Sequence, residues 1–337
     1  MRIAILTPTL YEFSGIDREV ELQAKRYIQH GDFVSIFTLD ATITIEGVSI
    51  INIGMPKTLF WQRVYRLFFF FDIVKVFRYI KELRNFDIIY SHLYPMNLLA
   101  LGAKYFYNKR YIYYNNGIAP AYTFHKFHEK VYIEIFRFLS NVTTRYADEV
   151  VSISKYLSDI FEKETGRRGR IQHITVNEGR FHKYVDRMHI RQKYGMEDSL
   201  IVLYVGRLSP HKGVDLLIRA FQEILHMAPQ ARLIIVGKPT FSAYYEKLKN
   251  ISSPEIIFAG AVSDKELPYY YAACDVYATA SLWEGFDMPL VEAQACGKPV
   301  VAFDIGPHKE LINEKGILVQ PKNIAQLSKA LEEVLSR

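Results

Sequence analysis

Short apolar runs rich in β-branched residues alternate with helical patterns from one end of the chain to the other. Strands that are buried on both faces and separated by helices are typical of parallel, doubly wound sheets. The first half predicts strands at 2–7, 33–38, 48–53, 87–91, 110–114 and 149–153. The second half predicts strands at 172–176, 200–205, 232–236, 255–259, 275–279 and 299–303. The sequence therefore predicts an α/β protein with two Rossmann-like domains.

The alternation is interrupted between residues 165 and 199, by T-G-R-R-G-R and later by K-Y-G-M-E-D-S. A chain of 337 residues is long enough for two domains that each bury a core. We expect an N-terminal domain over 1–170, a C-terminal domain over 171–322, and a final helix over 323–337 that packs back toward the N-terminal domain. Ligands of open α/β sheets sit beyond the carboxyl ends of the strands, so the loops there are the candidates for function.

Composition places the chain in the cytoplasm. Its only two cysteines, Cys274 and Cys296, lie in apolar surroundings and are expected to be buried thiols in a reducing compartment. The chain starts at once as a strand, with no N-terminal signal visible. The most apolar run, 67–74, is far shorter than the roughly 20 residues that a membrane-spanning helix needs.

Positive charge is concentrated in the first half, where residues 1–170 hold 23 Lys and Arg against 17 Asp and Glu. Within 57–84, basic residues that include Arg63, Arg66, Lys75 and Arg78 stand beside aromatic ones. We expect this stretch to form a helix, and a helix that carries basic and aromatic side chains together suits the surface of an anionic membrane. A half-buried helix with a solvated basic face explains the same pattern, and both interpretations stay open. No nucleic-acid-binding motif accompanies the charge, so nucleic acid is not an expected partner.

The stretch W-E-G-F-D-M-P-L-V-E carries two carboxylates, Glu284 and Glu292, on either side of Pro289. Proline suits the first position of a helix, so Glu284 is expected on the loop before it and Glu292 is expected to point out of the first helical turn. A helix N-terminus attracts phosphate. Carboxylates beside a phosphate suit the neutral hydroxyl groups of a sugar and a ribose, although helix capping alone would also explain them.

The loop G-R-L-S-P-H-K-G follows the strand predicted at 200–205 and carries Arg207 and Lys212. Two cations on a glycine-bounded loop are able to clamp a diphosphate, but solvated loop cations are an equal alternative. The loop lacks the order of a P-loop, and no G-x-G-x-x-G follows a strand, which argues against a nicotinamide dehydrogenase. No zinc-ligand spacing and no D-x-D occur, so we predict no metal site.

Together these loops resemble the GT4-type family of retaining, nucleotide-sugar-dependent glycosyltransferases, whose two-domain fold is called GT-B. The resemblance is strong over 142–320, in the blocks 145–156, 205–221, 258–267 and 281–302. It is looser in the N-terminal half, over 14–25 and 87–95. The resemblance implies an active site in the cleft between two Rossmann-like domains, with the acceptor on the N-terminal domain and the nucleotide sugar on the C-terminal one.

The resemblance also implies roles for individual residues. Arg207 and Lys212 would hold the donor diphosphate, Glu292 the ribose, and Glu284 the hydroxyls of the transferred sugar. Further donor contacts would come from Gly15, Lys238, Val262, Phe286, Asp287, Met288 and Leu290. Transfer would occur on the front face, with the departing phosphate oxygen taking the proton of the acceptor hydroxyl, and would require no metal or other cofactor beyond the nucleotide-diphosphate sugar.

One departure from the family concerns the loop after strand 110–114. Many relatives carry a histidine there, near the transferred sugar, whereas this chain has Asn116, which we count with the catalytic candidates. An amide hydrogen-bonds a hydroxyl but does not titrate. His92 and Asn115 are weaker candidates for the cleft or acceptor site, and a structural role for His92 explains its position equally well.

The sequence thus predicts a hexosyltransferase that acts on a glycan or lipid-linked acceptor, in the cytoplasm or peripherally on the inner membrane face. A soluble enzyme that makes a small disaccharide or glycosylated metabolite is the alternative. A non-catalytic protein that binds nucleotide sugars is a third interpretation, supported only by Asn116.

Overall fold

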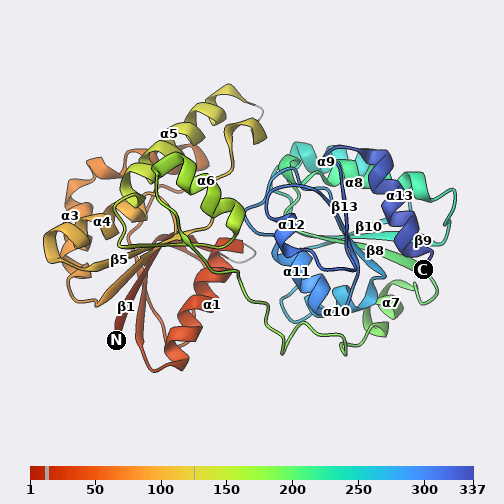
Figure 1. Ribbon diagram of the computed structural model, residues 1–337, viewed down its shortest axis with the longest axis horizontal. Coiled ribbons are helices and arrows are strands. Elements are labelled where there is room, and N and C mark those ends of the chain that lie inside the picture. Colours follow the sequence, from red (N-terminus) through yellow and green to blue (C-terminus); the bar gives the residue numbers. More distant parts are fainter. Residues whose placement is uncertain (12–14, 125) are drawn as a thin grey trace. The chain divides into compact units, whose positions relative to one another are not determined.

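The computed structural model describes residues 1–11, 15–124 and 126–337, and the chain divides into two compact units (Figure 1). The first unit is Met1–Ile174 and the second is Thr175–Arg337. Each contains one parallel sheet covered by helices, which confirms the predicted fold class. The division lies close to the predicted boundary between residues 170 and 171. The predicted position of the active site between the domains stays a prediction.

The first unit holds a seven-stranded sheet in the order β3-β2-β1-β4-β5-β6-β7, with every pairing parallel. Its strands are β1 (Arg2–Leu10), β2 (Phe33–Ala41), β3 (Ser49–Asn52), β4 (Ile88–Ser91), β5 (Arg110–Asn115), β6 (Glu149–Ser152) and β7 (Arg170–Ile171). Its α-helices are α1 (Gly15–Gln29), α2 (Leu59–Leu67), α3 (Ile73–Leu83), α4 (Met96–Tyr107), α5 (Phe127–Thr144) and α6 (Lys155–Thr165), and the short 3-10 helices are η1 (Phe69–Phe71) and η2 (Ala121–Thr123).

Both faces of this sheet are apolar because successive side chains of a strand point to opposite faces. On β1, Ile3 and Ile5 pack with Val20 of α1, whereas Ala4 and Leu6 pack into a second cluster with α3 and α4. The continuous apolar run of β1 therefore reflects burial on both sides, as a doubly wound sheet requires.

The second unit holds a six-stranded parallel sheet in the order β10-β9-β8-β11-β12-β13. Its strands are β8 (Leu200–Val205), β9 (Ala231–Val236), β10 (Ile256–Gly260), β11 (Val276–Thr279), β12 (Val300–Phe303) and β13 (Ile317–Val319). Its helices are α7 (Met188–Tyr194), η3 (Pro210–Lys212), α8 (Val214–Ile224), α9 (Ser242–Ile251), α10 (Leu267–Ala273), α11 (Met288–Ala295), α12 (His308–Leu311) and α13 (Ile324–Leu335).

The final helix, α13, is part of the second unit. Leu327 and Leu331 are fully buried in the same apolar cluster as Leu217 and Phe221 of α8. Asn323 caps its start by accepting a hydrogen bond from the Gln326 amide at 3.0 Å. The helix thus covers the sheet from which it emerges, and its predicted packing toward the N-terminal domain stays a prediction.

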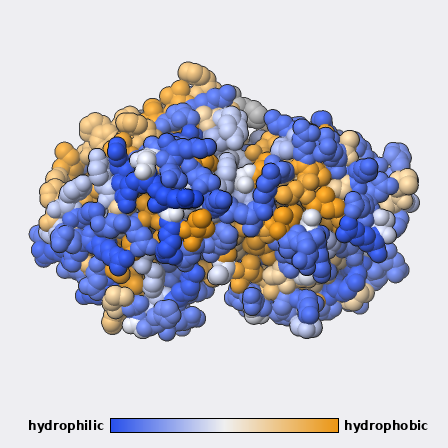
Figure 2. Space-filling model, viewed as in Figure 1, coloured by the Kyte–Doolittle hydropathy of each residue, from blue (hydrophilic) through white to orange (hydrophobic). Residues whose placement is uncertain are grey.

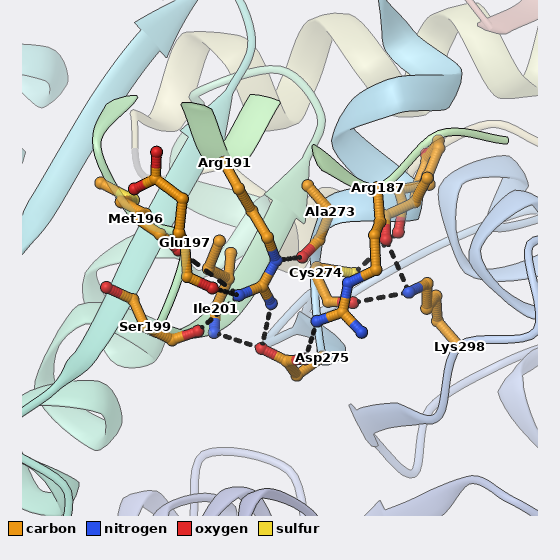
Figure 3. A network of polar contacts seen from close by, with 12 residues as sticks. Arg187, Arg191, Met196, Glu197, Ser199, Ile201, Ala273, Cys274, Asp275 and Lys298 are labelled. Carbon is orange, nitrogen blue, oxygen red and sulfur yellow. Dashed lines mark hydrogen bonds and ion pairs between the residues drawn. The ribbon is translucent and has the colours of Figure 1, made fainter. Parts of the chain in front are cut away.

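A buried arginine anchors α7 to the amino ends of the second sheet (Figure 3). The guanidinium of Arg191 donates to the carbonyls of Ala273, Met196, Glu197 and Ser199, and also pairs with Asp275 at 2.7 Å. The same Asp275 carboxylate accepts the amide of Ile201, at the start of β8, at 2.8 Å. This network lies at the end of the sheet opposite to the carboxyl ends of its strands, so its role is structural.

Two secondary-structure predictions are wrong. Residues 172–176 form no strand, because β6 ends at Ser152 and offers no backbone partners beyond the bond from the Gln172 amide to the Ser152 carbonyl. The single helix expected within 57–84 is interrupted into α2, η1 and α3. Asp72 restarts the chain as α3 by accepting from the amide of Lys75 at 3.3 Å and from the hydroxyl of Tyr65 at 2.8 Å.

Among the described residues, none of the helices combines the length and the apolar character needed to cross a bilayer.

Candidate functional site

The strand order places a switch point in each sheet. In the second unit, β8 and β11 are neighbours, and the chain runs from β8 toward β9 on one side and from β11 toward β12 on the other. The loops that follow two such strands diverge and leave a crevice at the carboxyl ends, which is where open α/β sheets bind ligands. Lys212 lies on the loop after β8, and Glu284 lies on the loop after β11. The topology therefore brings these two predicted site residues together.

Lys212 and Glu284 form a direct ion pair in the largely buried crevice of the second unit. Ser281 adds a hydrogen bond from its hydroxyl to the same Glu284 oxygen at 2.8 Å. Burial raises the pKa of the Glu284 carboxyl, and the neighbouring Lys212 ammonium opposes this effect. The arrangement is a paired cation and anion, so a phosphate ligand that binds Lys212 has to compete with Glu284.

Glycine allows the two loops to approach so closely. Gly213 has φ +60°, and a Cβ atom built there would stand 2.0 Å from the carbonyl oxygen of Ala280. The amide of Leu282 donates to the His211 carbonyl at 2.7 Å, which ties the loop after β11 to the residue before Lys212. Any larger residue at position 213 would push the loops apart and separate Lys212 from Glu284.

The remaining cations of the predicted site lie on the same edge but are exposed. Arg207 follows β8 directly, and Lys238 follows β9. Their loops touch, because a Cβ atom on Gly237 would stand 1.8 Å from the Gly206 carbonyl oxygen. Val262, after β10, is partly buried. The structure thus lines up the loops after β8, β9, β10 and β11 along one edge of the sheet.

Helix α11 begins one residue earlier than predicted. Met288 is its first residue, Pro289 occupies the second position, and Asp287 is the N-cap, with Oδ1 3.4 Å from the amide of Leu290. The Leu290 side chain is fully buried in the core, whereas Phe286 and Met288 are partly buried. A ligand could therefore meet only the backbone of Leu290, and its amide already faces Asp287.

The expectation that Glu292 points outward from the first turn is wrong. Glu292 is the fifth residue of α11, and its exposed fraction is only 1%. The hydroxyl of Tyr271, on α10, donates to Glu292 Oε2 at 2.8 Å. This position therefore faces the interior of the unit, next to α10, instead of solvent.

A residue that the sequence analysis did not select, His308, completes the crevice. It starts α12, just beyond the carboxyl end of β12, and its Nε2 lies 3.1 Å from Asp287 Oδ2. Its Nδ1 lies 2.7 Å from the carbonyl oxygen of Phe303. The usable signal in the sequence was a histidine a few residues after β12, the strand next to β11.

In the first unit, the predicted residues follow β1, β4 and β5, which are also adjacent in the sheet. His92 is fully buried and sits between two amides: its Nε2 is 2.8 Å from Gln23 Oε1, and its Nδ1 is 2.9 Å from Asn116 Nδ2. These partners require Nε2 to donate and Nδ1 to accept, so the ring is neutral. Burial lowers the pKa of His92 to about 3, in agreement with that tautomer. His92 thus orients Asn116 within the protein.

Both the nitrogen and the oxygen of the Asn115 side-chain amide form hydrogen bonds within the protein. Its Nδ2 donates to Ser152 Oγ at 3.2 Å and to the Leu157 carbonyl at 3.1 Å, and its Oδ1 accepts the Gly117 amide at 3.2 Å. The geometry favours a structural role over acceptor binding. Gly15 is the first residue of α1 and is exposed, whereas Ser14, before it, lies outside the described residues.

The four cations predicted to contact a membrane differ in exposure. Arg63 reaches Glu129 of α5 at 3.4 Å, and Lys75 donates to the Gly54 carbonyl at 3.1 Å. Arg66 is partly buried, whereas Arg78 is exposed. The Arg63 side chain keeps an exposed fraction of 43% beside Glu129, so membrane contact by these cations stays a prediction.

A hollow of about 370 Å³ lies on the α1 side of the first sheet. None of the predicted site residues lines it. Within the described part of the chain, no cluster of three or more histidine, cysteine or carboxylate side chains has the arrangement of a metal site. Cys274 and Cys296 are buried free thiols, as expected.

Comparison with known proteins identifies both halves of the chain. The family model described as Glycosyltransferase Family 4 matches residues 13–175, and the one described as Glycosyl transferases group 1 matches residues 186–337. A GDP-mannose-dependent alpha-(1-6)-phosphatidylinositol monomannoside mannosyltransferase of Mycolicibacterium smegmatis is 31% identical over 207 residues, which is 56% of this chain and 53% of the relative. Mannosylfructose-phosphate synthase of Agrobacterium fabrum is 31% identical over 172 residues, which is 47% of this chain and 38% of the relative.

The chain thus spans about half the length of the first of these curated relatives and less of the second. Solved structures match over nearly its whole length. Anabaena HepE in complex with UDP and glucose superimposes with a TM-score of 0.79 at 22% identity, covering 99% of this chain and 89% of that one. Sucrose-phosphate synthase from Thermosynechococcus elongatus gives a TM-score of 0.81 at 20% identity, covering 100% and 90%. At these identities the structures establish the fold.

Proposed function

The chain belongs to the GT4-type glycosyltransferases with the GT-B fold, and on that premise we propose that it moves a hexose-type sugar from a nucleoside-diphosphate sugar to a glycan or lipid-linked acceptor. The observation that carries the proposal is the pairing of Lys212 with Glu284 at the switch point of the second sheet. A cation for a diphosphate and a carboxylate for sugar hydroxyls stand side by side there, as a nucleotide sugar needs.

The donor roles follow from the chemistry of the side chains. Lys212 and the exposed Arg207 hold the diphosphate, since ammonium and guanidinium groups bind phosphate by charge-assisted hydrogen bonds. Glu284 accepts hydrogen bonds from the hydroxyls of the transferred sugar, and Glu292 accepts those of the ribose. This would bring the ribose hydroxyls to a buried carboxylate that also accepts a hydrogen bond from Tyr271. Lys238 and Val262 contribute to the binding of the base.

The proposed reaction retains the configuration of the sugar. The oxygen of the acceptor hydroxyl bonds to the anomeric carbon on the face from which the diphosphate departs. The bond between that carbon and the diphosphate oxygen breaks, and this oxygen takes the proton of the acceptor hydroxyl. Lys212 and Arg207 stabilise the negative charge that develops on the leaving diphosphate. This scheme uses no metal, and Asn116 contributes an amide that hydrogen-bonds a sugar hydroxyl.

An exposed apolar surface of the first unit supports a lipid-linked acceptor. Helix α5 carries a stripe with helical spacing along its exposed side, and α2, η1 and α3 carry further large exposed side chains. We call these residues the apolar surface: Leu59, Phe60, Trp61, Phe68, Phe71, Ile73, Val74, Phe77, Phe127, Val131, Ile135, Phe138 and Val142. Val74 and Phe127 are each 80% exposed. Figure 2 shows apolar residues along the upper margin of this unit, where Figure 1 draws α5.

Single exposed apolar residues are ordinary, but so many on neighbouring helices mark an interaction surface. Exposed cations stand among them at Arg78, Lys81 and Arg84 on and after α3. Aromatic side chains beside cations suit the headgroup region of an anionic membrane. We therefore place the enzyme peripherally on the inner membrane face, where a lipid-linked acceptor would be presented.

A soluble transferase that makes a small product is the second candidate. The observation in its favour is the similarity to mannosylfructose-phosphate synthase and to sucrose-phosphate synthase, whose names describe small sugar phosphates. The apolar surface favours the first candidate, because a soluble enzyme would gain nothing from exposing it.

Release of nucleoside diphosphate tests the proposal and separates the candidates. The protein is incubated with UDP-glucose or GDP-mannose and with either extracted membrane lipids or hexose phosphates as acceptors. We expect release that depends on the lipid fraction and that Lys212→Ala abolishes, whereas Lys193→Ala, a surface residue paired with Glu266, leaves it unchanged. Release that depends on hexose phosphates instead would establish the second candidate. The absence of release from a panel of nucleoside-diphosphate hexoses would refute transferase activity.

A further inference from the structure

His308 and Asp287 lie at the base of the crevice and contact each other without contacting solvent. Their exposed fractions are 0% and 2%. They come from different segments, since Asp287 precedes α11 and His308 follows β12. A contact between two buried polar residues across segments fixes the position of one loop against the other.

The hydrogen-bond geometry determines the charge of His308. Its two ring nitrogens face acceptors, the Phe303 carbonyl at 2.7 Å and Asp287 Oδ2 at 3.1 Å. Both nitrogens must carry a proton to donate to these acceptors, and only the imidazolium does so. A neutral ring would turn a lone pair toward one of the two oxygens. The contact is therefore a buried ion pair.

Asp287 uses its other oxygen within its own helix. Oδ1 lies 3.4 Å from the Leu290 amide and caps α11, where a negative charge also suits the helix dipole. Without a cation nearby, a carboxylate in so buried a position would be costly. His308 supplies that cation, and the pair sets where α11 and the preceding loop begin.

The pair adjoins the groups proposed to bind the donor. Glu284 stands three residues before Asp287 and is paired with Lys212. The four charges, two positive and two negative, balance. Loss of the His308 proton would leave two buried carboxylates to share one ammonium group, since the charge of Lys212 already acts on Asp287.

We propose that His308 is a positioning residue: its ion pair with Asp287 fixes the start of α11 and reserves Lys212 for Glu284 and the donor diphosphate. This inference rests on the proposed function for the role of Lys212, but the ion pair itself does not. Asp287 is then a residue that shapes the donor loop through its own chain and does not contact the nucleotide sugar.

The ion pair should make the stability of the second unit decrease as the pH rises. Burial lowers the pKa of His308, but the hydrogen bond and charge of Asp287 outweigh it, and the net pKa is raised above 6.5. Stability from this group is fully present below about pH 6.5 and is lost as pH rises through the raised pKa. Burial raises the pKa of Asp287, but the hydrogen bond of His308 outweighs it, and the net pKa lies below 3.8. The loss of stability that comes from protonation of Asp287 is therefore expected only at acidic pH.

The tyrosines and the second histidine around the pair do not titrate near neutral pH. The hydroxyl of Tyr271 donates to Glu292, whereas those of Tyr204 and Tyr277 donate to backbone carbonyls, and burial raises the pKa of all three well above 10. His211, beside Lys212, has its pKa lowered to about 3 by burial and by the neighbouring cations, so it is neutral. Burial also raises the pKa of Glu284, so the alkaline transition is assigned to His308 by its dependence on Asp287.

Two substitutions test the proposal together. Asp287→Asn keeps an oxygen for the Leu290 amide and an NH₂ group that donates to neutral His308, so it preserves the contact without charge. His308→Gln leaves the Asp287 carboxylate with no imidazolium, so Asp287 competes with Glu284 for Lys212. Lys309→Gln, an exposed neighbour on α12, is the matched control.

Isothermal titration with UDP and GDP at pH 7 measures donor affinity, and thermal unfolding is followed from pH 6 to 9. We expect His308→Gln to lose at least tenfold in affinity and the double variant with Asp287→Asn to regain most of it, which a purely structural histidine would not allow. The melting temperature of the wild type should fall with rising pH relative to Asp287→Asn.

Equal pH profiles for the wild type and Asp287→Asn would overturn the ion pair. Unchanged affinity in a folded His308→Gln variant would overturn the reservation of Lys212. If the wild type binds no nucleoside diphosphate at any pH, the proposed function fails and the role of Lys212 fails with it. The melting profiles still decide the ion pair in that case, so the two failures are distinguishable.

Discussion

Replacing Glu284 with glutamine should make free nucleoside diphosphate bind more tightly while sugar transfer slows. The side chain keeps its shape and still accepts the hydrogen bond of Ser281, but the charge that pairs with Lys212 is removed. In the wild type, a diphosphate that binds Lys212 weakens the ion pair between Lys212 and Glu284, and the Glu284 carboxylate also repels the diphosphate. Neither unfavourable contribution to binding is present in Glu284→Gln.

The size of the effect follows from the ion pair. Two opposite charges about 4 Å apart attract by about 4 kcal/mol at an effective dielectric constant near 20. If binding of the diphosphate removes a third of that attraction, the free energy of binding to the wild type is less favourable by about 1.4 kcal/mol. This difference corresponds to about tenfold in affinity. We therefore expect Glu284→Gln to bind UDP or GDP, whichever the wild type prefers, about tenfold more tightly.

Transfer should change in the opposite direction. Hydrogen bonds from sugar hydroxyls to a charged acceptor contribute about 1.5–3 kcal/mol each, so their weakening should slow transfer by about 10- to 100-fold. Tighter binding of the product with slower turnover separates this explanation from general damage, which would weaken both.

The assay is isothermal titration at pH 7.5 with each nucleoside diphosphate, together with thermal unfolding to confirm that the variant is folded. Glu266→Gln is the matched control, because Glu266 pairs with Lys193 at 2.9 Å on the surface of the same unit. The control should bind as the wild type does. Equal or weaker binding by a folded Glu284→Gln variant would refute an exchange of partners by Lys212.

Three further substitutions test other parts of the structure. Glu292→Ala should reduce affinity for the nucleoside diphosphate about tenfold in titration, whereas unchanged affinity would remove Glu292 from the ribose site. Arg191→Met should lower the free energy of unfolding in urea by about 3 kcal/mol or more, because five acceptors each lose one donor; a loss below about 1 kcal/mol would contradict an anchoring role. Arg78→Glu with Lys81→Glu should reduce the amount of protein that sediments with anionic vesicles but not the small amount that sediments with zwitterionic ones. Equal sedimentation of variant and wild type with anionic vesicles would exclude α3 from membrane contact.

From the sequence alone, Arg66 and Arg78 would have been the two arginines to replace in the test of membrane contact. Nothing in the sequence distinguishes Arg66 from Arg78, because both are arginines within the same basic stretch. The structure shows Arg66 partly buried, so reversing its charge would disturb folding as well as binding. Exposure of a side chain depends on where a helix is interrupted, and the interruption at η1 is set by the contacts of Asp72 with Tyr65 and Lys75.

The longer strands of both sheets were predictable because burial on two faces requires an apolar run that the sequence displays. The strand β8 has the predicted limits, 200–205. The short strand β13 was missed, since three apolar residues after a glycine are too few for a periodic signal. The false strand at 172–176 has the right residue types but lacks a neighbour, and pairing partners are not visible in a local pattern.

The same distinction applies to the candidate site. Lys212 and Glu284 were selected separately, by their loops, and the sequence predicts neither their ion pair nor the close approach at Gly213 that permits it. His308 stood in no motif, and its importance depends on the buried carboxylate beside it. Residue types and loop positions can be inferred from the chain, but partners across 72 residues of sequence come only from the fold.

The central claim is that the second unit binds a nucleoside-diphosphate sugar through Lys212. A thermal-shift panel of nucleoside diphosphates and their sugars, with and without EDTA, measures this directly on the wild type and on Lys212→Ala. We expect a selective rise in melting temperature for one nucleotide and its sugar, unchanged by EDTA and absent in Lys212→Ala. An equal rise in the variant, or no rise with any nucleotide in the wild type, would contradict it.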